Sequence, residues 1–181
     1  MKAQNTEISY GWIAILLHWM VAITIFAMAG LGLYMVDLDY YNAWYHRAPY
    51  IHKSVGVLLL MVMLLRVFWR FSNVVPKAVE GVKPWEETIA ALVHKAMYLL
   101  IFAIMFSGYL ISTADKKSVE VFGWFEVPAT LTSIPNQEDV AGVVHLVLVV
   151  FLLVLVAMHA GAALKHHFID KNRTLLRMLG R

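Results

Sequence analysis

The sequence predicts an all-α integral membrane protein, an up-down-up-down bundle of four helices in a single domain covering residues 1–181. Of these residues, 61% are hydrophobic and only 15% are charged, whereas a soluble domain is nearer half apolar and a quarter charged. The apolar residues gather in four stretches, at about residues 10–35, 50–70, 88–113 and 141–164. Each stretch is long enough to cross a bilayer, which takes roughly 20 mostly apolar residues.

The first two stretches show how charge limits the spans. No charged residue lies between Glu7 and Asp37. This stretch is too long for the core of a cleaved signal peptide and lacks a basic leading segment, so we interpret it as a true span. The uncharged centre of the second stretch, residues 54–65, is too short to cross a bilayer alone. Lys53 and Arg66 are therefore expected within the membrane or at its edge.

The distribution of basic residues predicts the orientation. Eleven lysines and arginines fall on the side that holds both termini and the second connection, and four fall on the other side. Because cytoplasmic segments carry the excess of basic residues, both termini are expected in the cytoplasm. The net charge of +3 is too small and too scattered to indicate nucleic-acid binding.

Histidine is the residue type that points to chemistry. The chain has no cysteine, which excludes thiolate-bound metals and haem attached through a C-x-x-C-H motif. Ionisable residues inside a membrane are costly and usually functional. Five of the eight histidines fall within the predicted spans: His18, His52, His94, His145 and His159.

The two histidines of the fourth span set the geometry. His145 and His159 are 14 residues apart, which on a helix is about 21 Å along the axis and about 40° short of a full turn. One helix could thus supply one axial ligand to each of two stacked haems. His52 is the outer partner at the depth of His145. At the depth of His159 both His18 and His94 qualify, and depth does not choose between them.

Other uses of these histidines fit less well. A membrane histidine can simply hydrogen-bond a neighbouring helix, but five at two depths are unlike such a case. A zinc site needs three or four ligands at one point. A proton relay suits histidine but lacks carboxylates within the spans. The remaining histidines, His46, His166 and His167, lie outside the spans and are expected at the surface.

Residues near the histidines could serve a flat macrocycle. Gly56, Gly142 and Gly161 lie within four residues of a span histidine and could let a macrocycle approach the backbone, or could serve ordinary helix packing. Arg66 lies 14 residues beyond His52 and could pair with a propionate of the inner haem, or could be a snorkelling anchor.

In order and spacing, several short motifs resemble the bacterial cytochrome b561 family, the four-helix dihaem relatives of the cytochrome b subunits of nickel–iron hydrogenases and formate dehydrogenases. The resemblance covers almost the whole chain. The matching residues are His18-Trp19, His52 with Gly56, Arg66 with Arg70, Val93-His94, Phe122-Gly123 with Pro128, His145, His159 with Ala163, His166-His167-Phe168, and Asp170-x-Asn172-x-Thr174-Leu175-x-Arg177-Met178.

The resemblance implies two non-covalent b haems, each held by two histidines. It pairs His18 with His159 and His52 with His145, and makes His94 a non-ligand near a propionate, a quinone or a proton path. It implies ubiquinone as one partner and a multi-pass place in the bacterial inner membrane, in contact with lipid.

The expected activity is that of a superoxide oxidase, in which superoxide donates electrons and ubiquinone accepts them, with Lys53 steering the anion. The alternative is a non-enzymatic electron-transfer subunit anchored to a redox protein. A histidine-lined transporter is a third class, which an absorption spectrum would separate. The sequence leaves a homodimer open.

Overall fold

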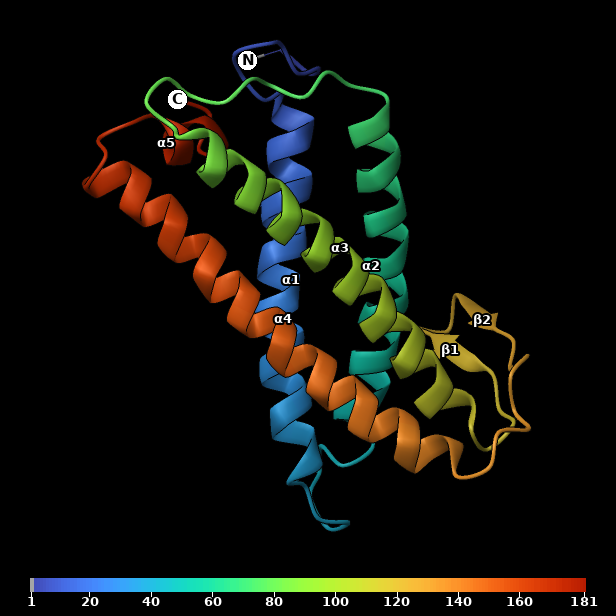
Figure 1. Cartoon of the computed structure of the whole chain (residues 1–181). Helices are drawn as coiled ribbons and strands as arrows, with labels where there is room; N and C mark the ends of the chain where they lie inside the picture. Colours follow the sequence, from blue (N-terminus) through green and yellow to red (C-terminus); the bar gives the residue numbers. More distant parts are fainter. Residues whose placement is uncertain (1) are drawn as a thin grey trace. The chain divides into compact units, whose positions relative to one another are not determined.

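The computed structural model describes residues 2–181, and they are mostly helical (Figure 1). The elements are α1 (Trp12–Val36), α2 (Arg47–Phe71), α3 (Pro84–Thr113), β1 (Val119–Val121), β2 (Phe125–Val127), α4 (Gln137–Phe168) and α5 (Thr174–Met178). The helices α1 to α4 are each long and apolar enough to cross a membrane. The prediction of an all-α protein with four spanning helices is therefore confirmed, and its single domain stays a prediction.

The helices α3 and α4 extend beyond the predicted spans because polar residues stabilise their ends. Pro84 takes the first position of α3, where its missing N–H costs nothing. Glu86 Oε2 accepts a hydrogen bond of 3.0 Å from the backbone N–H of Lys83, as in a capping box. The first turn of α4 is acidic and its last turn basic, which suits the helix dipole. Apolarity alone does not reveal such turns.

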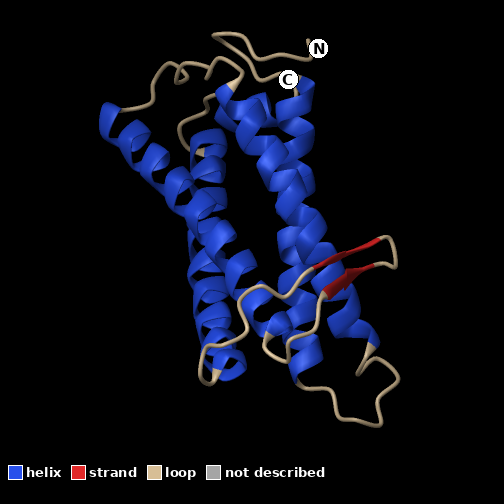
Figure 2. Cartoon of the chain, turned by 90° about the vertical axis from the view of Figure 1, so that its right-hand side faces the viewer, coloured by secondary structure: helices blue, strands red, loops and turns tan. Residues whose placement is uncertain are grey.

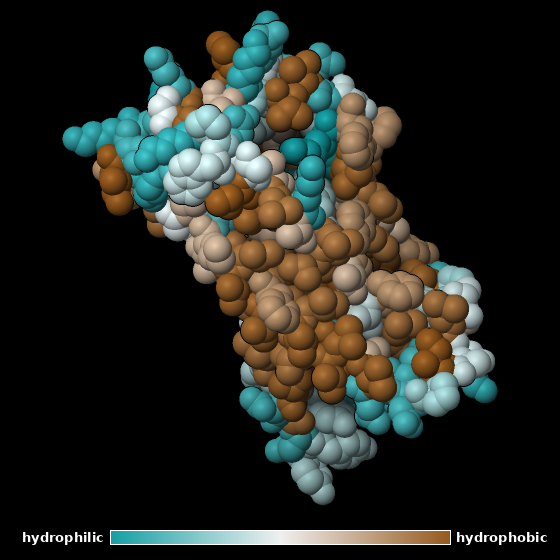
Figure 3. All heavy atoms as spheres, in the orientation of Figure 1, coloured by the Kyte–Doolittle hydropathy of each residue, from teal (hydrophilic) through white to brown (hydrophobic). Residues whose placement is uncertain are grey.

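The helices expose large apolar side chains to their surroundings. Phe26, Leu92 and Phe151 are exposed by 58%, 66% and 61%, and apolar side chains dominate the helical surface visible in Figure 3. Soluble proteins rarely expose apolar patches of this extent. A helix satisfies its own backbone hydrogen bonds, so such a surface is stable against lipid.

The contacts of the chain divide it into two compact units. The first unit holds the described residues up to Val21, together with Val62–Leu99 and Phe151–Arg181. In it, α5 is tied to α1 because Trp19 Nε1 donates to the carbonyl of Met178 at 2.8 Å.

The second unit holds Ala22–Met61 and Leu100–Val150 and contains a small antiparallel hairpin, β1 paired with β2 (Figure 2). Its turn places Phe122 and Gly123 at φ angles of 50° and 71°. The buried Ser54 hydroxyl of α2 donates to the Glu120 carbonyl and accepts from the Phe122 N–H, both at 3.3 Å. The predicted all-α fold did not include this hairpin.

Candidate functional site

Three of the span histidines meet in the first unit. The ring centroids of His18 in α1 and His159 in α4 are 6.2 Å apart, with an angle of 59° between the ring planes. His94 in α3 lies closer to His159, with 5.0 Å between centroids. All three side chains are half-buried. In the first unit, His159 therefore has two histidine neighbours, His18 and the closer His94.

Arg66 is turned towards this group. Its Nη2 donates to His18 Nδ1 at 3.0 Å, and its Nε donates to the Tyr98 hydroxyl at 2.9 Å. Because a guanidinium can only donate, His18 Nδ1 is the acceptor in this arrangement. Arg70, one turn further along α2, is exposed. Arg66 therefore contacts His18, a predicted ligand, directly. The sequence did not reveal this contact.

The remaining two span histidines meet in the second unit. The ring centroids of His52 in α2 and His145 in α4 are 6.3 Å apart, with 67° between the ring planes. His145 Nδ1 lies 3.0 Å from both the Ile104 carbonyl and the Ser107 hydroxyl. A hydrogen bond from Nδ1–H to that carbonyl leaves the lone pair of Nε2 free for a metal.

Two glycines that the sequence interpretation did not single out give these rings room. A Cβ at Gly32 would lie 3.3 Å from His52 Cε1, and one at Gly108 would lie 3.2 Å from His145 Cε1. A side chain at either position would press on the imidazole.

The glycines that were singled out have more space. Around Gly142 and Gly161 a Cβ would meet nothing within 4 Å, and at Gly56 only the Met28 methyl group, at 3.8 Å. Glycines that contact a ring across two helices cannot be recognised from sequence spacing.

The spacing of both histidine pairs suits axial ligation of one iron. A metal–imidazole bond of about 2.0 Å, with the ~1.1 Å from nitrogen to ring centre, puts two opposed imidazole centroids about 6.2 Å apart. The pairs at 6.2 and 6.3 Å fit this distance, and the His94–His159 pair at 5.0 Å does not. His52 Nδ1 is buried and has no hydrogen-bond partner among residues 2–181. The donors present fit haem b.

Lys53 lines an open groove in the second unit. The groove has a volume of about 540 Å³ and is lined by Met35, Val36, Tyr45, His46, Pro49, Tyr50 and Lys53. Lys53 and His46 are exposed. Lys53, the residue that follows His52, therefore places a cation beside aromatic side chains.

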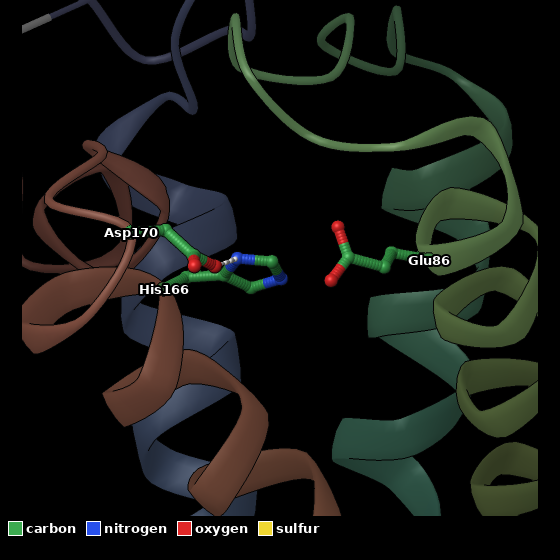
Figure 4. Close-up of side chains that lie close together, drawn as sticks. All are labelled: Glu86, His166 and Asp170. Atoms are coloured by element: carbon green, nitrogen blue, oxygen red, sulfur yellow. Dashed lines mark hydrogen bonds and ion pairs between the residues drawn. The ribbon is translucent and has the colours of Figure 1, made fainter.

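A second cluster of potential ligands lies in the first unit, where Glu86 of α3 points towards His166 and Asp170 (Figure 4). His166 Nδ1 lies 2.7 Å from Asp170 Oδ2. The Lys165 ammonium already pairs with Glu86 at 2.7 Å and with Asp170 at 2.9 Å. The hydrogen bond from Lys165 holds the pKa of the Asp170 carboxyl below its usual value.

We interpret this cluster as an ion-pair network between α3 and the end of α4. Within it, His166 is half-buried and bonded, rather than a free surface residue.

Comparison with known proteins gives consistent matches over the whole chain. The family model described as prokaryotic cytochrome b561 matches residues 9–181. Cytochrome b561 homolog 2 of Escherichia coli (strain K12) is 50% identical, over 100% of this chain and 96% of its own. Cytochrome b561 homolog 1 of the same strain is 32% identical, over 99% and 98% of the two chains.

A third relative carries a functional name. The probable superoxide oxidase CybB of Yersinia pestis is 29% identical, over 94% of this chain and 95% of its own. Four helices able to span a membrane, together with these matches, indicate a multi-pass bacterial membrane protein that carries haem b. The chain belongs to the prokaryotic cytochrome b561 family, whose work is transmembrane electron transfer.

Proposed function

We propose that this protein holds two b haems non-covalently, one between His18 and His159 and one between His52 and His145. The observation that carries this proposal is the centroid distance of 6.2 and 6.3 Å in the two pairs. Haem b would supply reversible one-electron transfer there, and a pair of histidines at each site would suit electron transfer rather than oxygen binding. His94 then serves a propionate, a quinone or a proton path.

The side chains around the ligands hold them in position. The Ile104 carbonyl and Ser107 orient His145, since a hydrogen bond to Nδ1 fixes the tautomer and the ring. An imidazole that binds metal through Nε2 carries its proton on Nδ1, and that proton cannot face a guanidinium. We therefore infer that Arg66 leaves His18 Nδ1 when the ligand is engaged and pairs with an anion, such as a haem propionate.

The overall reaction that we favour is superoxide:ubiquinone oxidoreduction. Each superoxide gives up one electron and leaves as oxygen, and ubiquinone takes two electrons and two protons to become ubiquinol. The similarity to a probable superoxide oxidase supports this reaction. The exposed Lys53 beside the groove offers a cation that would attract an anionic donor.

The alternative is an electron-transfer subunit that passes electrons between a redox protein and quinone. The similarity to two proteins named only as cytochrome b561 homologs is compatible with this alternative. In either case we place the protein in the inner membrane with both termini in the cytoplasm, on the basis of its basic residues.

Stopped-flow mixing of the purified protein with superoxide and a ubiquinone analogue tests the enzyme proposal. Superoxide should reduce the haems and the quinone should reoxidise them, and both changes are followed in the haem absorption bands. A pyridine haemochrome assay should first give two haems per chain, extractable by acid acetone because the chain has no cysteine. If superoxide leaves the bands unchanged, the subunit alternative is the better account.

Lys53→Gln tests the steering role. Salt screens charges over about 8 Å at physiological ionic strength, so the reduction rate should fall as salt rises. It should fall several-fold in Lys53→Gln, with unchanged haem content. Lys117→Gln is the matched control, because Asp115 already pairs with that ammonium at 2.7 Å. A wild-type rate in Lys53→Gln would exclude this residue from steering.

A further inference from the structure

The closing motif of the chain, from Asp170 to Met178, is not explained by the histidine pairs. In the structure it covers most of the turn after α4 and the whole of α5. Asn172 Oδ1 accepts from the N–H and from the hydroxyl of Thr174, at 3.1 and 2.7 Å, which starts α5. The bond from Trp19 to the Met178 carbonyl then holds α5 against α1, one residue from His18. These hydrogen bonds hold the segment that carries Arg177 in place.

Two contacts hold the guanidinium of Arg177, a hydrogen bond from Nη1 and an aromatic ring against its face. Its Nη1 donates to the Lys77 carbonyl at 2.8 Å. Its Cζ lies 5.5 Å from the centroid of the Tyr10 ring, within the range of a cation–π contact. The nearby carboxylate of Glu7 is taken by Lys77 Nζ at 2.7 Å. The position of Arg177 is thus set without any anionic partner.

The other edge of the same guanidinium is unpartnered. Nε and Nη2 of Arg177 are both buried and have no acceptor among residues 2–181. These two N–H groups lie side by side on one edge of the planar group, the edge that grips a carboxylate or phosphate with two parallel hydrogen bonds. Arginine stays charged at every physiological pH. A buried charged donor without an acceptor is costly, so an acceptor is expected there.

We propose that this edge of Arg177 is a binding site for an oxyanion with two coplanar oxygens, a carboxylate or a phosphate. Two sources offer that chemistry, a propionate of the haem proposed between His18 and His159, and the phosphate of an anionic membrane lipid. Tyr10 lies two residues before the start of α1, at the end of a spanning helix, where lipid headgroups lie. The propionate source rests on the proposed function, and the lipid source does not.

The test uses the complete, haem-loaded protein in nanodiscs that contain anionic lipid. The variants are Arg177→Gln and Arg177→Lys, with Arg173→Gln as the control because Arg173 is an exposed residue of the same segment. Midpoint potentials of the haems are measured by spectroelectrochemistry. Anionic phospholipid retained per chain is counted by mass spectrometry on the detergent-purified protein, before it is placed in nanodiscs.

If a propionate occupies the site, Arg177→Gln should make one haem about tenfold harder to reduce, which is about 59 mV for one electron. If a lipid phosphate occupies it, the potentials stay and retained anionic lipid falls several-fold. Arg177→Lys keeps the charge but has no paired edge, so the same readout should change in the same direction by a smaller amount. It also covers the event that the glutamine variant does not fold.

The inference is overturned if neither readout changes, if Arg173→Gln changes them equally, or if Arg177→Lys behaves as the wild type. Fewer than two haems per wild-type chain would instead count against the proposed function, and the lipid measurement would still test Arg177.

Discussion

At the scale of single residues, ring distances distinguish the two histidines near His159. His18 and His94 both lie near His159, but only the His18 ring stands at the spacing of two opposed axial ligands. The His94 ring is more than 1 Å too close to His159 for that arrangement, because the centroids are 5.0 Å apart instead of about 6.2 Å. Depth along the helix left open whether His18 or His94 is the partner of His159, and mutation of each residue can test this.

We expect His18→Ala to lose one haem and His94→Ala to keep both. His159→Ala should lose the same haem as His18→Ala, and His52→Ala or His145→Ala should lose the other. The measurement is haem per chain by pyridine haemochrome, with the low-temperature α-band to tell which haem remains. Loss of a haem in His94→Ala together with two haems in His18→Ala would assign the ligand to α3 instead.

A single methyl group should disturb the site in the second unit. In Gly108→Ala the new Cβ would lie 3.2 Å from His145 Cε1, closer than an ordinary contact, so the ring must shift. We expect a changed midpoint potential or lower occupancy of one haem. Gly30→Ala is the control, because nothing lies within 4 Å of its Cβ position. Equal spectra and potentials in both variants would mean that the ring accommodates the methyl group.

At the scale of elements, short polar segments hold helix ends in place. The turn after α4 is fixed by its own hydrogen bonds, and Lys165 connects it to the first turn of α3 through Glu86. The Ser54 hydroxyl ties the hairpin to α2 within two residues of His52. Of these contacts, the one made by Ser54 lies beside a predicted ligand, His52.

The Asp170 network should contribute stability that depends on pH. The hydrogen bond from Lys165 lowers the pKa of Asp170 in the folded protein. A lowered pKa stabilises the fold above the unfolded pKa, and this stability is lost as pH falls through the folded value. Asp170→Asn should therefore lower the unfolding temperature at pH 7, and the difference should shrink as pH falls below about 4 towards the lowered pKa of the folded protein.

The measurement is thermal unfolding in detergent across a pH series. Asp37→Asn serves as the control, because Asp37 is exposed and lies outside this network. A difference between wild type and Asp170→Asn that does not shrink at all between pH 7 and pH 3 would show that the carboxylate charge is not the source.

At the scale of the whole molecule, the orientation in the membrane determines which side each partner reaches. The basic residues predict cytoplasmic termini. Because the chain has no cysteine, single cysteines report topology without background. A membrane-impermeant maleimide should label Ser118→Cys in intact cells, and should label Gln4→Cys and Lys171→Cys only after lysis. The reverse labelling pattern would mean that the protein has the opposite orientation, with the groove at Lys53 facing the cytoplasm.

The sequence by itself determined the four spanning helices and the histidines that could matter. Both follow from local properties, since a bilayer crossing needs a continuous apolar run and a histidine inside one is conspicuous. It predicted helix ends less well at α3 and α4, and it missed the hairpin, because capping contacts and strands of three residues leave little periodic signal.

Only the tertiary structure decided which side chains meet across helices. Depth could not separate His18 from His94, because both lie about equally far from a helix end, and only packing sets the ring distances of 6.2 and 5.0 Å. Gly108 against His145, Arg66 against His18 and the unpaired edge of Arg177 are likewise contacts between residues distant in sequence. Spacing along one helix specifies a face and a height, whereas a contact also requires the position of the neighbouring helix.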